Sequence, residues 1–267
     1  LNTDELQEAL DRTYDYTVLV VEDDPDIQGY LQAELKQNFH VLVADNGVKA
    51  LEVLMSEEVS MVISDVMMPE MNGFDLCRKI KSDIVLSHLP VMLLTALSDD
   101  KQQMYGAASG ADAYIQKPFN IEVVKLRIIK LLEDRARLRE AYARDASSPA
   151  VSVKEEKAGS MDDLFMNRFL KLIEESYADP DFSIEKGSEK LGLSRVHLYR
   201  KVKELAGVTP TDFLRNYRLK KAAALLRRKA GNVNEVAYAT GFGSPAYFSK
   251  CFKAVYNITP TEYLEKE

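Results

Sequence analysis

Polar side chains able to take part in phosphoryl transfer stand directly after short apolar runs: Glu22, Asp23, Asp65, Thr95 and Lys117. The runs have the length of buried strands and cover residues 18–21, 61–64, 91–94 and 113–116. In a parallel sheet the carboxyl ends of the strands lie at one edge, and ligand sites collect there. We therefore expect three acids, a hydroxyl and an ammonium group to converge on one site.

Carboxylates and an ammonium group in this arrangement suit a metal-assisted attack on phosphorus. Mg²⁺ takes oxygen ligands, keeps several waters and uses one or two carboxylates together with phosphate. Asp23 and Asp65 could supply those carboxylates, with Glu22 acting through water, while Lys117 adds a positive charge. Asp65 is then expected to attack as a nucleophile and form an acyl phosphate. A single acid at a strand end more often caps the next helix, but the joint placement favours the phosphoryl site.

The elements that must hold these side chains alternate between strand-like runs and helical patterns from Thr17 to about Arg144. The strand-like runs are apolar on both faces, as in parallel strands covered by helices. The helical patterns cover residues 25–37, 47–56, 73–81, 99–109 and 121–144. This alternation predicts an α/β domain with a doubly wound, five-stranded parallel sheet.

Charge is distributed unevenly along the 267 residues, whose length suggests about two domains. Residues 1–160 hold 17 Lys and Arg against 28 Asp and Glu, a net charge of −11. Residues 161–267 hold 18 against 14, a net charge of +4, and residues 186–229 alone hold 13 against 3. Such a basic stretch is usually a solvated face, but in a suitable fold it becomes a nucleic-acid footprint through counterion release.

Composition also sets the expected boundaries and compartment. We expect an N-terminal linker over residues 1–16, a first domain over 17–144, a flexible Ser-, Lys- and Glu-rich linker over 145–160, and a second domain over 161–267. Cys77 and Cys251 are too few for a disulfide framework, so a reducing cytoplasm fits. No apolar run approaches the roughly 20 residues that span a bilayer. The first residue is Leu1, which suggests a fragment of a longer protein.

The first domain resembles the receiver domain of response regulators over residues 17–135. The acidic run at 20–24, the loop at 65–73, the Thr95-Ala96 pair and the segment at 114–119 match the signature of that family. The resemblance implies that Asp65 accepts phosphate from a phosphohistidine, and that Mg²⁺ is held by Glu22, Asp23, Asp65 and the Met67 backbone carbonyl. It also implies that Thr95 and Tyr114 reorient on phosphorylation and that Lys117-Pro118 is a cis peptide.

The second domain contains an internal repeat, with copies at residues 184–214 and 233–264. Each copy has a helix, a turn with glycine and a second helix that starts after Ser194 or Ser244, which are natural N-caps. This pattern predicts an all-α domain with two helix-turn-helix units. The residues expected to face the core in the first copy are Val196, Leu198, Val202 and Leu205.

Candidate DNA contacts lie in the second helix of each copy. In the first copy they are Ser194, Arg195, Val196, His197, Tyr199, Arg200 and Lys203. In the second copy they are Ser244, Ala246, Tyr247, Ser249, Lys250 and Lys253. Val196 is in both the core set and the contact set. His197 is expected to pack or contact phosphate, since no second metal ligand lies near it in the sequence.

The second domain resembles the AraC-type DNA-binding domain over residues 162–265, most closely at residues 241–253. The first copy departs from the family at Gly187-Ser188, and a glycine inside a helix costs roughly 1 kcal/mol relative to alanine. The first unit is therefore expected to be looser. The resemblance implies two helix-turn-helix units that enter successive major-groove segments of double-stranded DNA.

Together the two domains predict a phosphorylation-controlled, sequence-specific transcription regulator of a two-component phosphorelay, not an enzyme. The expected partners are DNA, a histidine kinase, a second copy of the chain and RNA polymerase. Pairing of copies is expected through residues 99–109 and 121–144. The pairing of the two domains also resembles the C-terminal part of hybrid sensor kinases, which we favour over a free-standing regulator; this portion would be the cytoplasmic part of an inner-membrane protein.

Two other classes of function compete with this prediction. One is an aspartyl-phosphate phosphatase. That family resembles this chain in its strand-end Asp, but it has a second acid two residues after the nucleophile, where this chain has Met67. An adaptor whose helix-turn-helix units no longer bind DNA would show no steep salt dependence. The resemblance to receiver domains also implies that the residues two positions after Asp65 and Thr95 admit or exclude attacking water. Met67 and Leu97 stand there, and both are bulky and apolar, so a slowly hydrolysing acyl phosphate is expected.

Overall fold

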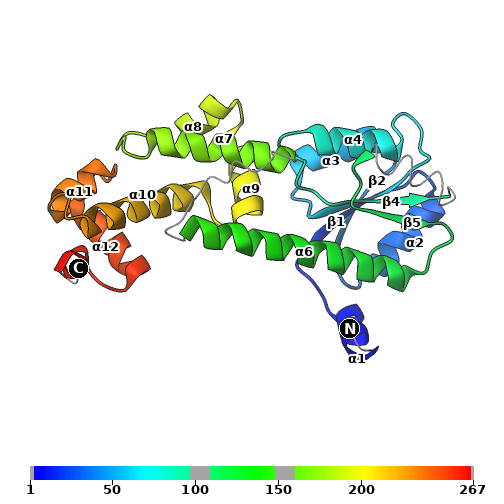
Figure 1. The fold of residues 1–267 in the computed structure, drawn as a ribbon. Helices are drawn as coiled ribbons and strands as arrows, with labels where there is room; N and C mark the ends of the chain where they lie inside the picture. The colour runs from blue at the N-terminus through cyan, green and yellow to red at the C-terminus, as the bar shows by residue number, and fades with distance from the viewer. Residues whose placement is uncertain (1–2, 97–108, 148–159, 266–267) are drawn as a thin grey trace. The chain divides into compact units, whose positions relative to one another are not determined.

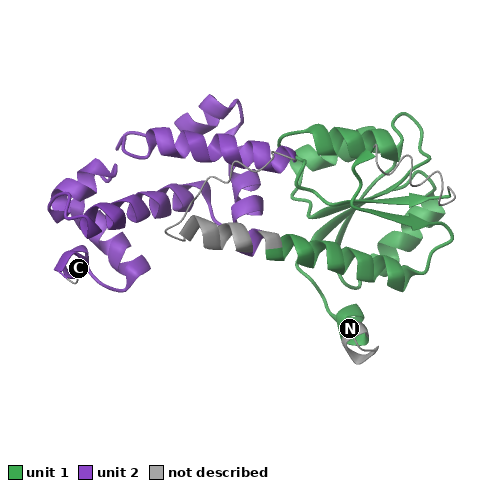
Figure 2. Cartoon of the chain, viewed as in Figure 1, with its two compact units in different colours: residues 1–137 green, residues 138–267 purple. Residues whose placement is uncertain are grey.

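The chain forms two compact units, residues 1–137 and 138–267 (Figure 2). The computed structural model describes residues 3–96, 109–147 and 160–265. Leu97, nearly all of the helix predicted over residues 99–109 and most of the linker predicted over residues 145–160 lie outside the described residues. Each unit is described by itself below.

A parallel sheet of five strands forms the centre of the first unit (Figure 1). The strands are β1 (Thr17–Val21), β2 (His40–Ala44), β3 (Met61–Asp65), β4 (Val91–Thr95) and β5 (Ala113–Gln116). Their spatial order is β2-β1-β3-β4-β5, and all four pairings are parallel. The predicted doubly wound α/β architecture is confirmed.

Helices cover both faces of this sheet (Figure 1). They are α2 (Pro25–Leu35), α3 (Gly47–Ser56), α4 (Gly73–Ser82) and α6 (Ile121–Ser147). One core packs side chains of α2 and α6 on β1, β3 and β4, and a second core packs α3 and α4 on the opposite face. Three of the four helices start at a side-chain cap, because Asp24, Asn46 and Asn72 accept hydrogen bonds from first-turn backbone N–H groups.

The segment expected to be a linker over residues 1–16 contains a helix, α1 (Thr3–Asp11). The buried Asn38 side chain donates hydrogen bonds to the carbonyls of Leu10 (2.6 Å) and Arg12 (2.9 Å). Tyr14 stacks on Phe39 with ring centroids 5.6 Å apart. The part of this segment from Leu10 to Tyr14 therefore packs against the first unit.

The described part of the second unit beyond α6 is helical: α7 (Met161–Ser176), α8 (Ile184–Leu191), α9 (Arg195–Ala206), α10 (Pro210–Arg227), α11 (Val233–Ala239), α12 (Pro245–Tyr256) and α13 (Pro260–Glu265). The pairs α8–α9 and α11–α12 are the two predicted helix-turn-helix units, and both pack against α10. Ser194 and Ser244 accept hydrogen bonds from third-residue N–H groups, as expected of N-caps. Among the described residues, no helix combines the length and apolar composition needed to cross a bilayer.

Two side chains of α9 lie opposite to their expected side. Val196 was expected both in the core and among the DNA contacts; the residue is 56% exposed, so the expectation of a core position is wrong. Val196 lies in the first turn of α9, two residues before the buried Leu198, and so faces away from the core. Lys201 was counted in the basic stretch but is fully buried, and its ammonium group pairs with Asp162 of α7 at 2.5 Å.

Gly187 in α8 accounts for the departure of the first helix-turn-helix unit from the AraC-type family pattern. A Cβ added at this position would lie 3.2 Å from the Phe182 ring and 3.4 Å from Leu172. The glycine therefore lets α8 approach these two side chains closely.

Candidate phosphorylation and DNA-binding sites

Three carboxylates meet at the carboxyl edge of the sheet. Glu22 and Asp23 follow β1, and Asp65 ends the adjacent strand β3. One oxygen from each group lies within 4.8 Å of the others. Glu22 and Asp65 are buried and Asp23 is exposed, so the cluster opens to solvent on the Asp23 side. The convergence predicted for the three acids is present.

The Lys117 ammonium joins two of these carboxylates. Its Nζ lies 2.8 Å from Glu22 Oε2 and 3.1 Å from Asp65 Oδ1. The Lys117–Pro118 peptide that follows β5 is cis, as expected. A lysine that reaches across two strands to both acids can balance their charge before any phosphate arrives.

Burial and ion pairing shift the pKa values of Glu22 and Lys117 in opposite directions. Burial raises the pKa of Glu22 above its usual range, although its hydrogen bond to Lys117 partly offsets that effect. Burial lowers the pKa of Lys117, but its hydrogen bonds to Glu22 and Asp65 outweigh burial, so the net pKa is raised. Lys117 therefore stays cationic at neutral pH.

The backbone around Asp65 depends on a glycine that sequence reasoning missed. A Cβ at Gly73 would lie only 2.1 Å from the Asp65 carbonyl oxygen, so no larger residue fits there. The Val66 N–H donates to Asp65 Oδ1 at 2.8 Å, which orients the carboxylate. Nothing in the composition separates Gly73 from the other glycines of the chain; only its place in the 65–73 loop could have indicated it.

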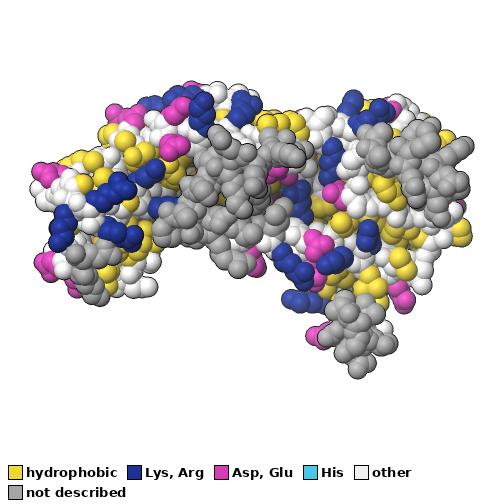
Figure 3. All heavy atoms as spheres, in the orientation of Figure 1, with side chains coloured by type: hydrophobic (Ala, Val, Ile, Leu, Met, Phe, Trp, Pro, Cys, Tyr) yellow, Lys and Arg dark blue, Asp and Glu magenta, His cyan; other side chains and the backbone are white. Residues whose placement is uncertain are grey.

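In the second unit, the predicted DNA contacts gather on α9 and α12. The most exposed large side chains among them are Val196 (56%), Tyr247 (52%) and Tyr199 (42%). Lys203, Lys250 and Lys253 are also exposed. Arg195 is exposed but pairs with Glu185 of α8 at 3.1 Å. Lys and Arg side chains lie across the surface of the second unit, including the part formed by α10 (Figure 3).

Comparison with protein families matches both halves of the chain. Residues 18–129 match the response regulator receiver domain, and residues 188–266 match a helix-turn-helix domain of the AraC type. The chain is a response-regulator receiver domain followed by an AraC-type DNA-binding domain. This is the organisation of a phosphorylation-controlled DNA-binding regulator.

Relatives of this chain differ widely in length. It is 38% identical to "Histidine kinase P4" of Formosa agariphila over 98% of this chain but only 19% of that protein. It is 27% identical to "Transcriptional regulatory protein HptR" of Staphylococcus aureus, covering 85% of this chain and 87% of that protein. "Transcriptional regulatory protein GltR" of Pseudomonas aeruginosa is 38% identical over 43% of this chain and 48% of its own length. The chain thus spans about a fifth of the first relative.

The receiver domain buries one of its two expected switch residues, Thr95, and half-buries the other, Tyr114. Thr95, at the end of β4, is only 1% exposed, and the register pairs it with Gln116 of β5. The Tyr114 hydroxyl shares a hydrogen bond with Ser109 Oγ. Burial raises the pKa of Tyr114, so its hydroxyl stays protonated.

The receiver's carboxylate cluster fits a divalent cation. Glu22, Asp23 and Asp65 offer three oxygens close together, and hard oxygen donors of this kind are what Mg²⁺ prefers. Met67 lies two residues after Asp65 in the loop that follows β3, with 72% of its side chain exposed.

Proposed function

We propose that this chain is the output portion of a two-component phosphorelay, which receives phosphate on Asp65 and then binds specific DNA sequences through two helix-turn-helix units. The observation that carries the proposal is Lys117, whose Nζ lies 2.8 Å from Glu22 and 3.1 Å from Asp65. A lysine so placed beside a buried aspartate can balance the negative charge of an incoming phosphoryl group. The match to both domain families supports the same reading.

The proposed phosphoryl transfer uses a simple displacement. A carboxylate oxygen of Asp65 attacks the phosphorus of a phosphohistidine on the donor kinase, the P–N bond breaks, and the imidazole nitrogen leaves with the electron pair. Glu22, Asp23, Asp65 and the Met67 carbonyl would hold Mg²⁺, which when bound neutralises charge on the transferred group. Lys117 stabilises the same charge from its position between the two acids.

The proposed response to phosphate runs through Thr95 and Tyr114. Phosphorylation adds about −1.5 to −2 charge and three acceptor oxygens to Asp65. Thr95 and Lys117 are drawn towards these oxygens, and Tyr114 fills the space that Thr95 leaves. Tyr114, Val123 and Leu126 line a hollow of about 410 Å³ on the outer face of β5 and α6. We propose this face for pairing with a second copy of the chain.

The proposed DNA contacts are the α9 and α12 residues named above, with Ser194 and Ser244 at the helix starts. Arg200, Lys203, Lys250 and Lys253 contact phosphates or guanine, and Tyr199 and Tyr247 contact base edges or stack. RNA polymerase is a further proposed partner. The domain boundaries we propose are 17–144 and 161–267, joined by a linker.

The proposed parent is a hybrid sensor kinase, with this portion on its cytoplasmic side. The support is the relative named as a histidine kinase, which matches almost the whole chain while being about five times as long. A free-standing regulator is the second candidate, supported by the relative HptR, of which the chain covers 87%. The chain itself is proposed to have no enzyme activity beyond accepting phosphate.

Selection of DNA sites with and without beryllofluoride, which mimics phosphate on aspartate, tests the proposal. We expect the treated chain to enrich one class of sequence, and Asp65→Asn to enrich none above the untreated level. Asp24→Asn is the matched control, because Asp24 caps α2 and lies outside the ligand set. Equal enrichment with and without beryllofluoride would refute the switch, and binding that does not fall steeply with salt would favour the adaptor reading.

A further inference from the structure

The two helix-turn-helix units meet at a junction built around Arg218 of α10. Its Nε donates to the Tyr177 carbonyl at 2.8 Å, and its Nη2 donates to the Asp179 carbonyl at 2.7 Å. Both carbonyls belong to the segment that leaves α7 and leads into α8, the start of the first unit. A single guanidinium thus satisfies two backbone acceptors just past a helix end, where acceptors lack intrahelical partners.

The turn of the second helix-turn-helix unit packs against the same junction. Gly241, with φ +80°, lies so close that an added Cβ would be 2.1 Å from the Tyr177 carbonyl oxygen and 2.9 Å from Arg218 Nε. The turn between α11 and α12 therefore abuts both the end of α7 and the guanidinium. Burial lowers the pKa of Arg218, but the group stays charged because arginine titrates far above neutral pH.

The equivalent glycine of the first unit has no such role. Gly192 occupies the same place in the repeat and also has a left-handed φ, +70°, but an added Cβ would meet nothing within 4 Å. Gly192 therefore meets only the conformational need of its turn, whereas Gly241 meets that need and also permits a close approach.

Beside this junction, a hollow separates the two helix-turn-helix units. The hollow, of about 280 Å³, is lined by Phe182, Ser183 and Ile184 of the first unit and by Gly243 and Tyr247 of the second, with Arg218 and Gly241 at its wall.

We propose that Arg218 and Gly241 are positioning residues that fix the separation of the two DNA segments read by α9 and α12. Neither residue needs to contact DNA in this role. The inference rests on the proposed DNA binding by two units. Without the Arg218 junction each unit keeps its own recognition helix, but the separation between them is no longer unique.

Selection of binding sites from random DNA tests the proposal, using the full chain activated with beryllofluoride. The wild type is expected to enrich two conserved blocks at one separation; a single block would refute the two-unit binding itself. Arg218→Met and Gly241→Ala are expected to keep both blocks but to accept several separations. Their affinity for the wild-type separation should fall about 100-fold, as when two linked modules no longer engage together, while either block alone binds unchanged.

Gly192→Ala is the matched control, because it carries the same backbone strain in open space, and its separation should stay unique. Arg218→Lys, which keeps an ammonium donor, is expected to relax the separation less than Arg218→Met. Circular dichroism monitors the fold of each variant. Variants that enrich the wild-type separation alone, or that enrich neither block, would overturn the proposal. So would a uniform loss of affinity with a salt slope reduced by about 1, which marks a direct phosphate contact.

Discussion

The two units place their charged side chains in opposite ways. In the receiver domain, Glu22 is 1% and Asp65 8% exposed, and Lys117 reaches inward to both. In the DNA-binding domain, most cations stand on the surface, and among those described Lys201 is the one whose whole side chain is buried. Buried charges interact strongly, so one added phosphoryl group changes much, whereas exposed cations act weakly and additively. The first arrangement suits a switch and the second suits a binding surface.

Removing the central cation of the receiver is the most severe way to break this contrast. Lys117→Met is expected to slow phosphorylation of Asp65 by a small phosphodonor about 1000-fold, because a preorganised charge partner is lost. Electrophoretic separation of phosphorylated and free chain measures the rate. Lys49→Met is the control, since Lys49 forms an exposed pair with Asp45; an unchanged rate in Lys117→Met would contradict the assignment.

Replacing Lys201, the buried cation of the DNA-binding domain, tests how much its ion pair contributes to stability. Lys201 is fully buried and Asp162 is 17% exposed, so Lys201→Met leaves an acid without its 2.5 Å partner. We expect a loss of about 3 kcal/mol in the free energy of unfolding, measured by urea titration of the whole chain followed by helical circular dichroism.

Lys203→Met serves as the matched control for Lys201, because it removes an exposed cation two residues away on α9, and its effect should stay within about 0.5 kcal/mol. The double variant with Asp162→Asn should recover part of the loss. Equal stability of the Lys201→Met and Lys203→Met proteins would show that burial of the pair is unimportant.

The two cysteines extend the contrast to thiol reactivity. Cys77 is fully buried, and burial raises its pKa from 9.0 to about 11, while Cys251 is partly exposed. At pH 8 the Cys77 thiolate should be about 100-fold scarcer than at an ordinary thiol, so an alkylating reagent should modify Cys251 first. Mass spectrometry of peptides locates the modification.

The same shift has a consequence for stability. A raised pKa means that the folded chain favours the protonated thiol, so this contribution is present below pH 9.0 and is lost as the pH rises towards about 11. Cys77→Ala should flatten that part of the pH profile. Faster labelling of Cys77 than of Cys251 in folded chain would contradict the burial.

A surface residue next to the buried site gives the smallest expected effect. Met67 is 72% exposed and apolar, and it lies two residues after Asp65. Met67→Asn, which can orient a water, is expected to shorten the lifetime of phospho-Asp65 several-fold, on the scale of one neutral hydrogen bond of about 1 kcal/mol. Decay of the phosphorylated band measures the lifetime, and a lifetime that does not change removes the basis for predicting slow hydrolysis.

The predictable parts of the molecule were those that follow from local pattern and a general packing rule. Each strand ends at a polar residue or directly before one, and parallel strands bring such ends to one edge. The convergence of Glu22, Asp65 and Lys117 follows from these two facts. Helix α3 likewise begins and ends at the predicted residues, because Asn46 is a strong cap.

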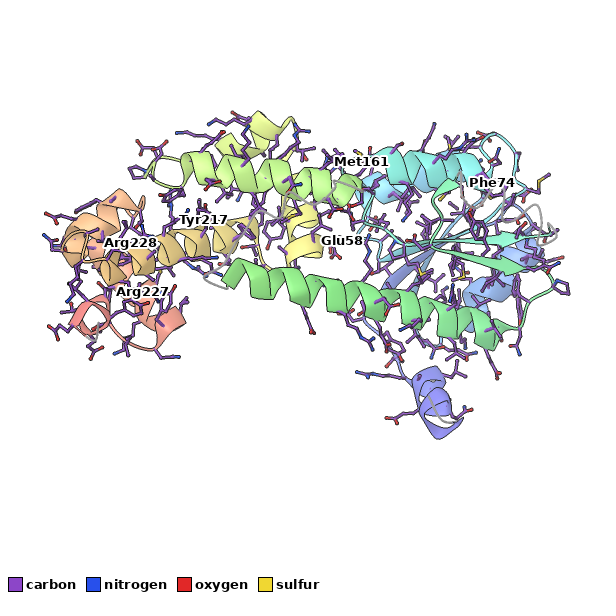
Figure 4. All side chains as sticks on the ribbon, viewed as in Figure 1. Glu58, Phe74, Met161, Tyr217, Arg227 and Arg228 are labelled. Carbon is purple, nitrogen blue, oxygen red and sulfur yellow. The ribbon has the colours of Figure 1, made fainter. Side chains whose placement is uncertain are left out.

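The unpredicted parts depend on partners far away in the sequence. Lys201 looks like any surface lysine until Asp162, 39 residues earlier, is brought beside it. Asn38 holds the N-terminal segment through carbonyls 28 and 26 residues away. Tyr217 and Arg227 both project from α10 (Figure 4), yet they contact the end of α7 and Tyr263 respectively. Such contacts become visible only once the tertiary structure is known.

The close contact between Gly73 and the Asp65 carbonyl oxygen leaves room for a hydrogen atom but not for a Cβ, and it restricts how the receiver domain can deform. Because the start of α4 lies in direct contact with the Asp65 backbone, a shift of Asp65 towards Gly73 would push on α4. We therefore expect a displacement on phosphorylation to be larger at the other flank of the sheet, where β4 and β5 carry Thr95 and Tyr114. On this view Gly73 couples α4 to Asp65, and β4 and β5 are the strands that are free to shift.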